Sequence, residues 1–496
     1  MHLSKSKYCL LWQCPKQLWL DTYHKELKTE DLGREARMVA GNEVGDLAMG
    51  LFGDYTEVTV LKEDGRPDLS AMIEKTRQCI ENGTENICEA SFSYEGLYCA
   101  ADILRRQDGG YAIYEVKSST HEAEIYGVDI AYQKYVLEHC GITVTGTYLV
   151  CIDSSYVRGE ELDISKLFKI VDMTEWVSLE TPVISSRLKL AEKTLASKEE
   201  PERDIGEHCR NPYKCPYWEY CSRHLPKPSV FNLYKLPFKK QLEYYRKGMV
   251  SYEDMLAAPK LNDKQLRQIQ YYLTDCGDYI DRGSIQDFLN TLSYPIYFLD
   301  FETMQPVIPL YPGTKPYQQI PFQYSLHYIE EPGGELKHKE FLAESGVNPM
   351  RDIAESLCRD IPWNVCVTAY FKGFECSRLK ELAAQFPDLA GHLMNIQGNI
   401  RDLLDPFQSG YYYNGAMGGS FSIKSVLPAL HPDDPTLDYH NLEGVHNGAE
   451  AMTIFPKIKN MPTEEQKKAR ENLLKYCKLD TYAMVKVWEA LIEAVN

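Results

Sequence analysis

The sequence lacks long apolar runs. None of its hydrophobic stretches reaches the roughly 20 consecutive apolar residues that a membrane-spanning helix needs, so we expect no membrane partner. The N-terminal stretch MHLSKSKYCLLWQCPKQLWL contains only a short apolar segment, and it lacks the small-residue cleavage site of a signal peptide. These two absences predict a cytoplasmic protein.

Positive charge is also scarce. The chain has 54 Lys and Arg against 72 Asp and Glu, a net charge of −18. A protein that coats nucleic acid regardless of sequence depends on Lys and Arg to displace counterions, so this class is disfavoured. A nuclease is not excluded, because active sites that hold divalent cations concentrate carboxylates.

The cysteines do not suggest a disulfide framework. There are 15 of them, an odd number, in a chain without a secretion signal. We expect most of them to be small buried hydrophobic residues. The length of 496 residues and the 44% content of hydrophobic residues suggest roughly two to four domains with at least two sizeable cores.

Periodicity predicts an α/β protein in three parts: residues 1–225, 226–290 and 291–496. The first part alternates strands and helices, with strands at 111–119 and 143–152 around a helix at 125–142 that ends near Gly141. The middle part is a Pro-punctuated connector followed by amphipathic helices at 241–256 and 261–276, which indicate a small helical linker.

The third part opens with a strand at 294–303. A loop rich in Gly and Pro at 311–321 and a second strand at 322–329 follow it, and the chain ends with one or two helices at 463–495. Sheets packed by helices, in two domains joined by the helical linker, are the simplest architecture for this pattern.

Two carboxylates interrupt the apolar strand at 294–303. Asp300 and Glu302 are two residues apart, so both project from one face of the strand. Like charges this close are unfavourable unless something neutralises them. Mg²⁺ or Mn²⁺ suits such an oxygen-only ligand set, and two such ions about 3.5–4 Å apart clamp the attacking water and the leaving oxygen of a phosphodiester.

Two later features extend this set. The stretch TAYFKGFECSRLKELA has the pattern of strand, turn and helix, with Glu375 at the helix start. Tyr476 and Asp480 are four residues apart, on one face of a helix. Taken singly, Asp480 suits a solvated helix charge and Tyr476 a half-buried core aromatic. Three such features in this order are much less common by chance.

The order of these motifs resembles the DEDD exonuclease superfamily in its Tyr-containing branch, DEDDy. The resemblance implies a ribonuclease-H-like domain in which the carboxylates hold two metal ions and Tyr476 orients the attacking water. The second motif departs from the family, which has Asn, a short spacer and Asp. Phe371 stands near the Asn position and Glu375 at the Asp position. Asp402 is a further candidate carboxylate.

The first part contains a second carboxylate set, with the spacing D-x12-E-x-K. A hairpin turn is expected between Asp102 and Glu115, and Glu115 shares a strand face with Lys117. Asp102 and Glu115 suit a divalent metal, and Lys117 suits the role of orienting the water or stabilising the charge that develops on the phosphate.

This arrangement, followed by a helix with Gln133 and Tyr135, resembles the PD-(D/E)xK nucleases of the RecB type. In that family the Gln/Tyr motif contacts the site from just downstream, which implies a site role for Gln133. Glu43 falls on the early helix where the family often has a His or an acidic metal ligand, although Gly45 is an alternative occupant of the His position.

Three cysteines follow at even spacing, Cys209, Cys215 and Cys221, and Cys14 lies far upstream. This pattern resembles the iron–sulfur staple of RecB-type exonucleases, which implies a 4Fe–4S cluster held by four thiolates. Zinc in a four-cysteine site is the direct competitor, and free cysteines beside aromatics are the structural alternative. Cys9 is an alternative to Cys14.

Both halves together resemble the uncharacterised bacterial DUF 2779 family, which joins a RecB-type nuclease to a ribonuclease-H-like exonuclease. We therefore expect a metal-dependent nuclease that acts on nucleic acid, DNA rather than RNA, at ends or in single strands, in repair or phage defence. Two alternatives stay open. In one, a single site is active and the N-terminal half is a binding module; in the other, the chain is a catalytically silent scaffold.

Overall fold

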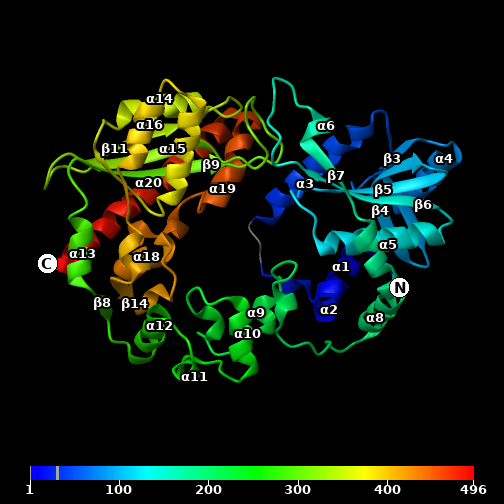
Figure 1. Ribbon diagram of the computed structural model, residues 1–496, viewed down its shortest axis with the longest axis horizontal. Helices are drawn as coiled ribbons and strands as arrows, with labels where there is room; N and C mark the ends of the chain where they lie inside the picture. The colour runs from blue at the N-terminus through cyan, green and yellow to red at the C-terminus, as the bar shows by residue number, and fades with distance from the viewer. Residues whose placement is uncertain (1, 30–32) are drawn as a thin grey trace. The chain divides into compact units, whose positions relative to one another are not determined.

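The protein is described here by a computed structural model, in which residues 2–29 and 33–496 are described. Contacts divide the chain into two compact units: Met1–His224 with Pro306–Gln318, and Leu225–Gln305 with Gln319–Asn496. Each unit has its own sheet with helices packed against it (Figure 1). The α/β class predicted from the sequence is confirmed.

The sheet of the first unit is mixed and has seven strands. They are β1 (Leu3–Ser4), β2 (Thr56–Glu57), β3 (Asn86–Tyr94), β4 (Leu97–Gln107), β5 (Gly110–Lys117), β6 (Val144–Ile152) and β7 (Phe168–Asp172). The order is β2-β3-β4-β5-β6-β7, and β1 pairs with β4. The pairs β1/β4, β2/β3 and β5/β6 are parallel, and the other neighbours are antiparallel.

Strand β4 changes its partner along its length. Its first two residues pair with β1 and its last five with β5, so Asp102 falls between the two paired segments. A two-residue turn leads into β5, and both Asp108 and Gly109 have positive φ angles, 49° and 80°. This is the conformation of a type I′ hairpin. The hairpin predicted between Asp102 and Glu115 is confirmed.

Helix α5 (Glu124–His139) is buried on most of its surface and packs against β3, β4, β5 and β6. Its sequence is apolar nearly all round, as expected for an interior helix. It ends just before Gly141, whose φ of +85° glycine adopts without strain. The other helices of this unit are α1 (Lys5–Gln13), α2 (Pro15–Tyr23), α3 (Arg34–Ala48), α4 (Leu69–Glu81), α6 (Ile164–Leu167), α7 (Thr174–Glu180), α8 (Ile184–Ala196) and α9 (Trp218–Cys221).

Pro306–Gln318 belongs to the first unit although it lies between two strands of the second unit in sequence. Nη1 of Arg158 donates to the carbonyl of Pro309 at 2.7 Å, and the backbone of Arg158 exchanges hydrogen bonds with Gly313 and Thr314. This loop, predicted from its Gly and Pro content, is therefore ordered by backbone pairing.

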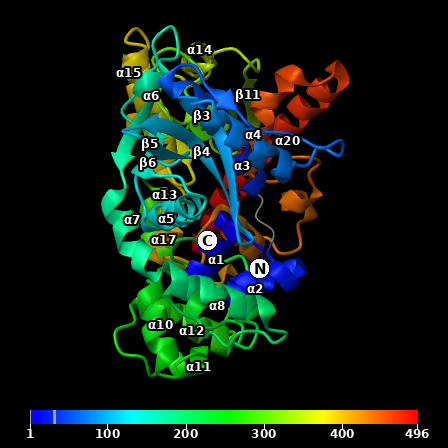
Figure 2. The same ribbon diagram turned by 90° about the vertical axis from the view of Figure 1, so that its right-hand side faces the viewer.

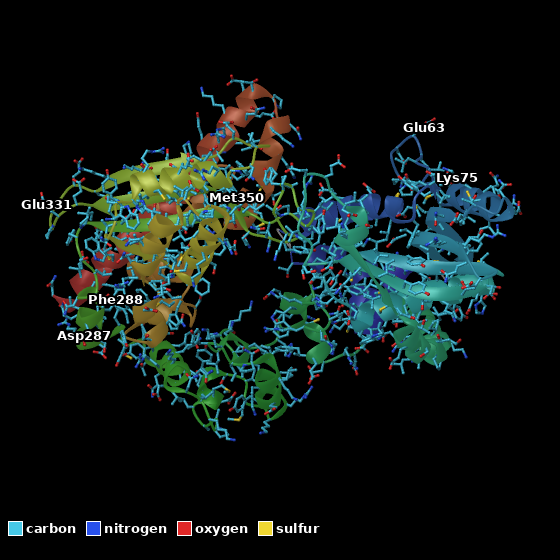
Figure 3. The ribbon with its side chains drawn as sticks, turned by 45° about the horizontal axis from the view of Figure 1, so that its top comes forward. Glu63, Lys75, Asp287, Phe288, Glu331 and Met350 are labelled. Carbon is cyan, nitrogen blue, oxygen red and sulfur yellow. The ribbon has the colours of Figure 1, made fainter. Side chains whose placement is uncertain are left out.

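The main sheet of the second unit has five strands. They are β9 (Ile296–Met304), β10 (Ile320–Ile329), β11 (Lys337–Leu342), β12 (Cys366–Ala369) and β13 (Ile400–Asp402), in the order β11-β10-β9-β12-β13. The first three form an antiparallel meander, whereas β12 and β13 run parallel to β9. Figure 3 shows Glu331 at the tip of the loop that joins β10 and β11. A separate ribbon pairs β8 (Asp278–Ile280) with β14 (Tyr412–Asn414).

Strand β9 lies at the centre of this sheet. It is buried on both faces, which explains its nearly continuous apolar sequence. Asp300 and Glu302 interrupt that run on one face. The parallel register of β12, in which Thr368 pairs with Phe298, brings the residues that follow β12 level with Asp300. Two chain segments that are far apart in sequence thus meet at one end of the sheet.

Helix α20 (Thr463–Val495) is a single helix of 33 residues that packs against β9 and β10. Other helices of this unit are α13 (Arg282–Leu289), α14 (Met350–Asp360), α15 (Gly373–Gln385), α16 (Ala390–Gly398), α17 (Asp405–Ser409), α18 (Ile423–Leu430) and α19 (Gly448–Ile454). Of these, α14, α15 and α16 pack against one another (Figure 1). No helix within residues 2–29 or 33–496 has the length and hydropathy of a bilayer-crossing segment.

The segment predicted as a helical linker contains α10 (Phe238–Arg246), α11 (Tyr252–Met255) and α12 (Asp263–Thr274), which Figure 2 shows grouped together. The single helix predicted over 241–256 is wrong. Gly248 has a φ of +75° and ends α10, and Ser251 then caps α11. The helix predicted over 261–276 is confirmed as α12. By contacts this segment belongs to the second unit; the three-part boundaries stay predictions.

Candidate functional site

Three carboxylates of the second unit converge from two elements. Asp300 and Glu302 project from one face of β9, and Asp480 comes from α20, which packs on that strand. One carboxylate oxygen of each residue lies within 4.8 Å of the other two. A compact set of oxygen ligands suits Mg²⁺ or Mn²⁺. The structure thus brings together three residues that the sequence singled out.

Burial and mutual repulsion dominate the electrostatics of this cluster. Burial raises the pKa of Asp300 well above its ordinary value, and the charges of Asp480 and Glu302 raise it further. The pKa of Glu302 is raised in the same way, first by burial and then by Asp480. Burial raises the pKa of Asp480 to about 6, although the hydrogen bond from Tyr439 and the charge of Lys424 oppose it. Such a cluster retains protons or attracts a cation.

Two tyrosines and a lysine border the cluster. The hydroxyl of Tyr439 donates to Oδ1 of Asp480 at 2.7 Å, and Tyr476 lies one helical turn before Asp480. The two tyrosine ring centroids are 6.0 Å apart. Nζ of Lys424 lies 4.8 Å from the ring centroid of Tyr439 and 5.6 Å from that of Tyr476. The predicted tyrosine is therefore accompanied by a second tyrosine and a cation.

Glu375 stands in the first turn of α15 with its side chain buried. Its Oε2 atom has no hydrogen-bond partner among the described residues. Burial raises its pKa to about 8, and its own charge raises the pKa of Asp300 and Glu302. Glu375 lies outside the group of three that meets the 4.8 Å criterion. An unpartnered buried oxygen beside a carboxylate cluster is available to a ligand.

Asp402, the further candidate carboxylate, accepts hydrogen bonds from the backbone. Its Oδ1 accepts from the backbone N–H of Phe371 at 2.8 Å and of Leu404 at 3.1 Å, and its Oδ2 accepts from that of Lys372 at 2.9 Å. These bonds hold the turn between β12 and α15, in which Phe371 has a φ of +70°. Asp402 thus fixes the backbone that leads to Glu375.

In the first unit, Glu115 is the centre of a network of ion pairs. It is fully buried on β5 and accepts from Nε2 of Gln133 at 2.7 Å. Nζ of Lys5 lies 3.0 and 3.2 Å from its two oxygens, and Lys117 also pairs with it. Lys117 reaches Oδ2 of Asp129 at 3.0 Å. Glu115, Lys117 and Gln133 are brought together as the sequence suggested, and Lys5 and Asp129 join them.

Asp102 borders this network. Its Oδ2 accepts from the backbone N–H of Val116 at 2.6 Å, and its Oδ1 lies 3.6 Å from Nζ of Lys5. Burial raises the pKa of Asp102 to about 6, and the charge of Glu115 adds to the shift. Burial acts in the same direction on Glu115, but the ammonium groups of Lys117 and Lys5 outweigh it and hold that pKa below its ordinary range.

Glu43 is not brought to this network. It lies on α3 with an exposed side chain, and no ion pair or hydrogen bond of the described residues links it to Asp102 or Glu115. A different glutamate lies closer. Glu89 sits on β3, where the pairing with β4 skips it, and has a φ of 58°. Burial raises its pKa to about 7, and the charge of Asp102 contributes next.

Comparison with known families identifies one region. Residues 297–422 match the model of a family described as Domain of unknown function (DUF2779). A search of curated proteins found no match. The DUF2779 region begins in β9 and includes Asp300, Glu302 and Glu375, whereas Asp480 lies beyond it. The family label expected from the sequence is supported over these residues.

Outside the DUF2779 region, four cysteines line one cavity of the first unit. Cys14, at the start of α2, meets Cys209, Cys215 and Cys221 there, and Lys16 lies beside them. Burial raises the pKa of all four thiols, and the thiols act on one another as charge neighbours. The four predicted cysteines are therefore brought together.

Cys9, the alternative to Cys14, does not line this cavity. Burial raises its pKa, and the charges of Asp129 and Lys117 in the carboxylate network act on it next. Helix α1 runs from the carboxylate network to the cysteine cavity. Lys5, its first residue, contacts the carboxylates. At the other end, Nε2 of Gln13 donates to the carbonyls of His208 and Tyr213, each at 2.8 Å, beside the loop that carries the cysteines.

The spacing of the four sulfur atoms bears on the metal they suit. Zn–S bonds of about 2.3 Å in a tetrahedral site set the sulfur atoms about 3.8 Å apart. Among the described residues, no three cysteines have sulfur atoms that all lie within 4.8 Å of one another. A 4Fe–4S cluster is larger than a single ion and holds its thiolates further apart. In every group of three, the sulfur atoms of this cavity are thus more widely spaced than a tetrahedral zinc site requires.

Proposed function

We propose that the chain is a divalent-metal-dependent nuclease whose active site is formed by Asp300, Glu302 and Asp480. The observation that carries this proposal is the convergence of these carboxylates within 4.8 Å, with no ion pair to any of them among the described residues. An uncompensated carboxylate cluster in a folded core is unfavourable in isolation. A function that uses cations accounts for its presence.

The residues present fit divalent cations. All three side chains offer oxygen, and Glu375 adds an unpartnered buried oxygen nearby. Mg²⁺ or Mn²⁺ prefers such ligands. When bound, these ions lower the pKa of water and neutralise the charge that develops on a phosphate during hydrolysis.

The surrounding side chains have distinct roles in this proposal. Tyr439 fixes the orientation of Asp480 through its 2.7 Å hydrogen bond. Tyr476 lies on the same face of α20 as Asp480 and positions the attacking water. Lys424 lowers the pKa of Glu302 and Asp480 and thereby favours their ionised, metal-binding forms.

The substrate class in this proposal is nucleic acid, and DNA in particular. The motif order in the second unit resembles DEDDy exonucleases, and the network around Glu115 resembles RecB-type nucleases, which also act on nucleic acid. The five-stranded mixed sheet with its antiparallel meander agrees with the expected ribonuclease-H-like domain. We therefore propose exonuclease action on single strands or ends, in repair or phage defence.

The four cysteines hold a structural cluster in this proposal. Cys14 lies near the N-terminus, and the other three lie near the end of the first unit. A cluster bound to them ties these distant segments together and stabilises the unit. Its thiolates take no part in hydrolysis.

The test is a cleavage assay on end-labelled single-stranded DNA, duplex DNA and RNA with Mg²⁺ or Mn²⁺. We expect the full chain to shorten single-stranded DNA, and Asp300→Asn and Asp480→Asn to abolish this. The matched control is Asp287→Asn, because Asp287 is an exposed carboxylate on α13 (Figure 3). Equal activity of the wild type and Asp300→Asn would refute the proposal.

A second arm asks whether one site or two are active. Glu115→Gln alters only the first unit and Asp480→Asn only the second. If Glu115→Gln retains full activity while Asp480→Asn has none, hydrolysis belongs to the second unit alone.

A further inference from the structure

Strand pairing and hydrogen bonds anchor the backbone around Lys5 in the first unit. It directly follows β1, whose Leu3 pairs with β4 and accepts a 2.6 Å hydrogen bond from the hydroxyl of Tyr132. Ser4 caps the helix that Lys5 begins, and Gln13 anchors the other end of that helix through two carbonyls. Hydrogen bonds therefore anchor both ends of helix α1, which carries the Lys5 side chain.

The ammonium group of Lys5 lies between the two carboxylates that the sequence assigns to a metal. It is 3.0 and 3.2 Å from both oxygens of Glu115 and 3.6 Å from Oδ1 of Asp102. Lys117 and Gln133 share the two Glu115 oxygens with Lys5, and the backbone N–H of Val116 donates to the other oxygen of Asp102. A cation that bridges Glu115 and Asp102 must use the oxygens that Lys5 occupies.

The charge of this network is partly balanced by its own lysines. Lys5 and Lys117 pair with Asp102, Glu115 and Asp129, and Glu89 lies near Asp102. The cluster of the second unit differs, because no lysine or arginine among the described residues forms an ion pair with its three carboxylates. Only the network of the first unit already contains its counter-ions.

We propose that the ammonium of Lys5 occupies the divalent-cation position of the first unit, so that Asp102 and Glu115 bind a metal ion only when Lys5 is withdrawn. Lys5 is then an internal counter-ion that competes with the metal ion for the same oxygens. This inference rests on the sequence-based prediction that Asp102 and Glu115 are metal ligands. It does not depend on hydrolysis by the second unit.

The test measures Mn²⁺ binding, by electron paramagnetic resonance and by calorimetry, on the full chain. Asp300→Asn/Asp480→Asn serves as the parent, because it removes the cluster of the second unit. In this parent, Lys5→Met keeps most of the side-chain stem but removes the charge. We expect it to bind Mn²⁺ about tenfold more tightly than the parent does, and Glu115→Gln added to it to abolish the gain.

Two further variants sharpen the result. Lys7→Met is the matched control, because Lys7 lies on the same helix but forms no ion pair with Asp102 or Glu115 among the described residues. Lys5→Arg keeps the positive charge and should bind Mn²⁺ as weakly as the parent does. Equal or weaker Mn²⁺ binding by Lys5→Met would overturn the inference.

A loss of stability does not remove the test. If Lys5→Met lowers the melting temperature, the inference requires Mn²⁺ to raise it more in this variant than in the parent, because a ligand stabilises the state that binds it. An equal Mn²⁺ shift in both proteins overturns the inference. The readout is Mn²⁺ binding and not cleavage, so these results are distinguishable from a failure of the proposed nuclease function.

Discussion

Tyr439 donates a hydrogen bond to Asp480 from 41 positions earlier in the chain, at a distance of 2.7 Å. The bond lowers the pKa of Asp480 against the effect of burial, which raises it. It also fixes the orientation of that carboxylate toward Asp300 and Glu302. In the proposed nuclease, a residue outside the predicted motifs thus orients a metal ligand.

Tyr439→Phe removes this donor but keeps the ring that Lys424 faces. We expect the affinity for Mn²⁺, and the rate of cleavage at limiting Mn²⁺, to fall about 10- to 100-fold, the usual effect of losing a partner of a metal ligand. Mn²⁺ titration of binding and of cleavage measures this. Tyr272→Phe, at an exposed tyrosine, is the control. Unchanged Mn²⁺ affinity in Tyr439→Phe would show that the bond is incidental.

Acid sensitivity should come in part from His327. Its Nδ1 atom hydrogen-bonds with the hydroxyl of Thr481 at 2.8 Å, and burial lowers its pKa from 6.5 to about 3, with a further contribution from His338. Between these two pH values, His327 is therefore protonated in the unfolded chain but neutral in the folded protein. Stability is complete above pH 6.5 and falls as the pH drops towards 3, by up to about 1.4 kcal/mol per pH unit.

Urea unfolding between pH 7 and pH 5 tests this. His327→Gln cannot take up the proton, so its free energy of unfolding should depend less steeply on pH than that of the wild type. His440→Gln, at an exposed histidine, should retain the wild-type slope. The same slope in His327→Gln and in the wild type would contradict the assignment.

Asp402 should contribute stability rather than catalysis. Asp402→Ala leaves the backbone N–H groups of Phe371, Lys372 and Leu404 without their acceptor. We expect a loss of about 2–4 kcal/mol in the free energy of unfolding, measured with urea. Asp405→Ala, three residues away and exposed, is the control. Wild-type stability with lost Mn²⁺ binding would instead make Asp402 a metal ligand.

The cysteine cavity should contain iron. We expect anaerobically purified protein to be brown, with absorption near about 400 nm, and Cys215→Ser to lose both the colour and the iron. Cys140→Ser, at an exposed cysteine, should keep them. Metal analysis and absorption spectra give the answer. A colourless protein with stoichiometric zinc would contradict the assignment.

Local periodicity was enough to predict the strands that carry Asp300, Glu302, Glu115 and Lys117. Alternation along a strand is a property of neighbouring residues, so the shared face of each pair followed from the sequence alone. The helix break at Gly248 was missed, because an amphipathic pattern continues across a glycine whose backbone conformation the pattern does not reveal.

The residues that sequence reasoning missed reach the sites through tertiary structure. Lys5 meets Glu115 because β1 pairs with β4, and Tyr439 meets Asp480 from a short 3-10 helix, Tyr439–Asn441, that precedes α19 in the chain. No local spacing signals either contact. The spacing of Asp129 could have indicated its role, because it lies four residues before Gln133 on the same face of α5. Glu43 was predicted as a metal ligand only from its position in the resemblance to RecB-type nucleases, and its side chain is exposed in the fold.

The most direct test of the central claim is a crystal structure of the full chain with Mn²⁺ and a short single-stranded DNA, using anomalous scattering to locate the metal. We predict manganese bound to the oxygens of Asp300, Glu302 and Asp480, with the phosphate at one end of the strand beside it. Manganese absent from these oxygens at a saturating concentration, while the fold is intact, would contradict the account.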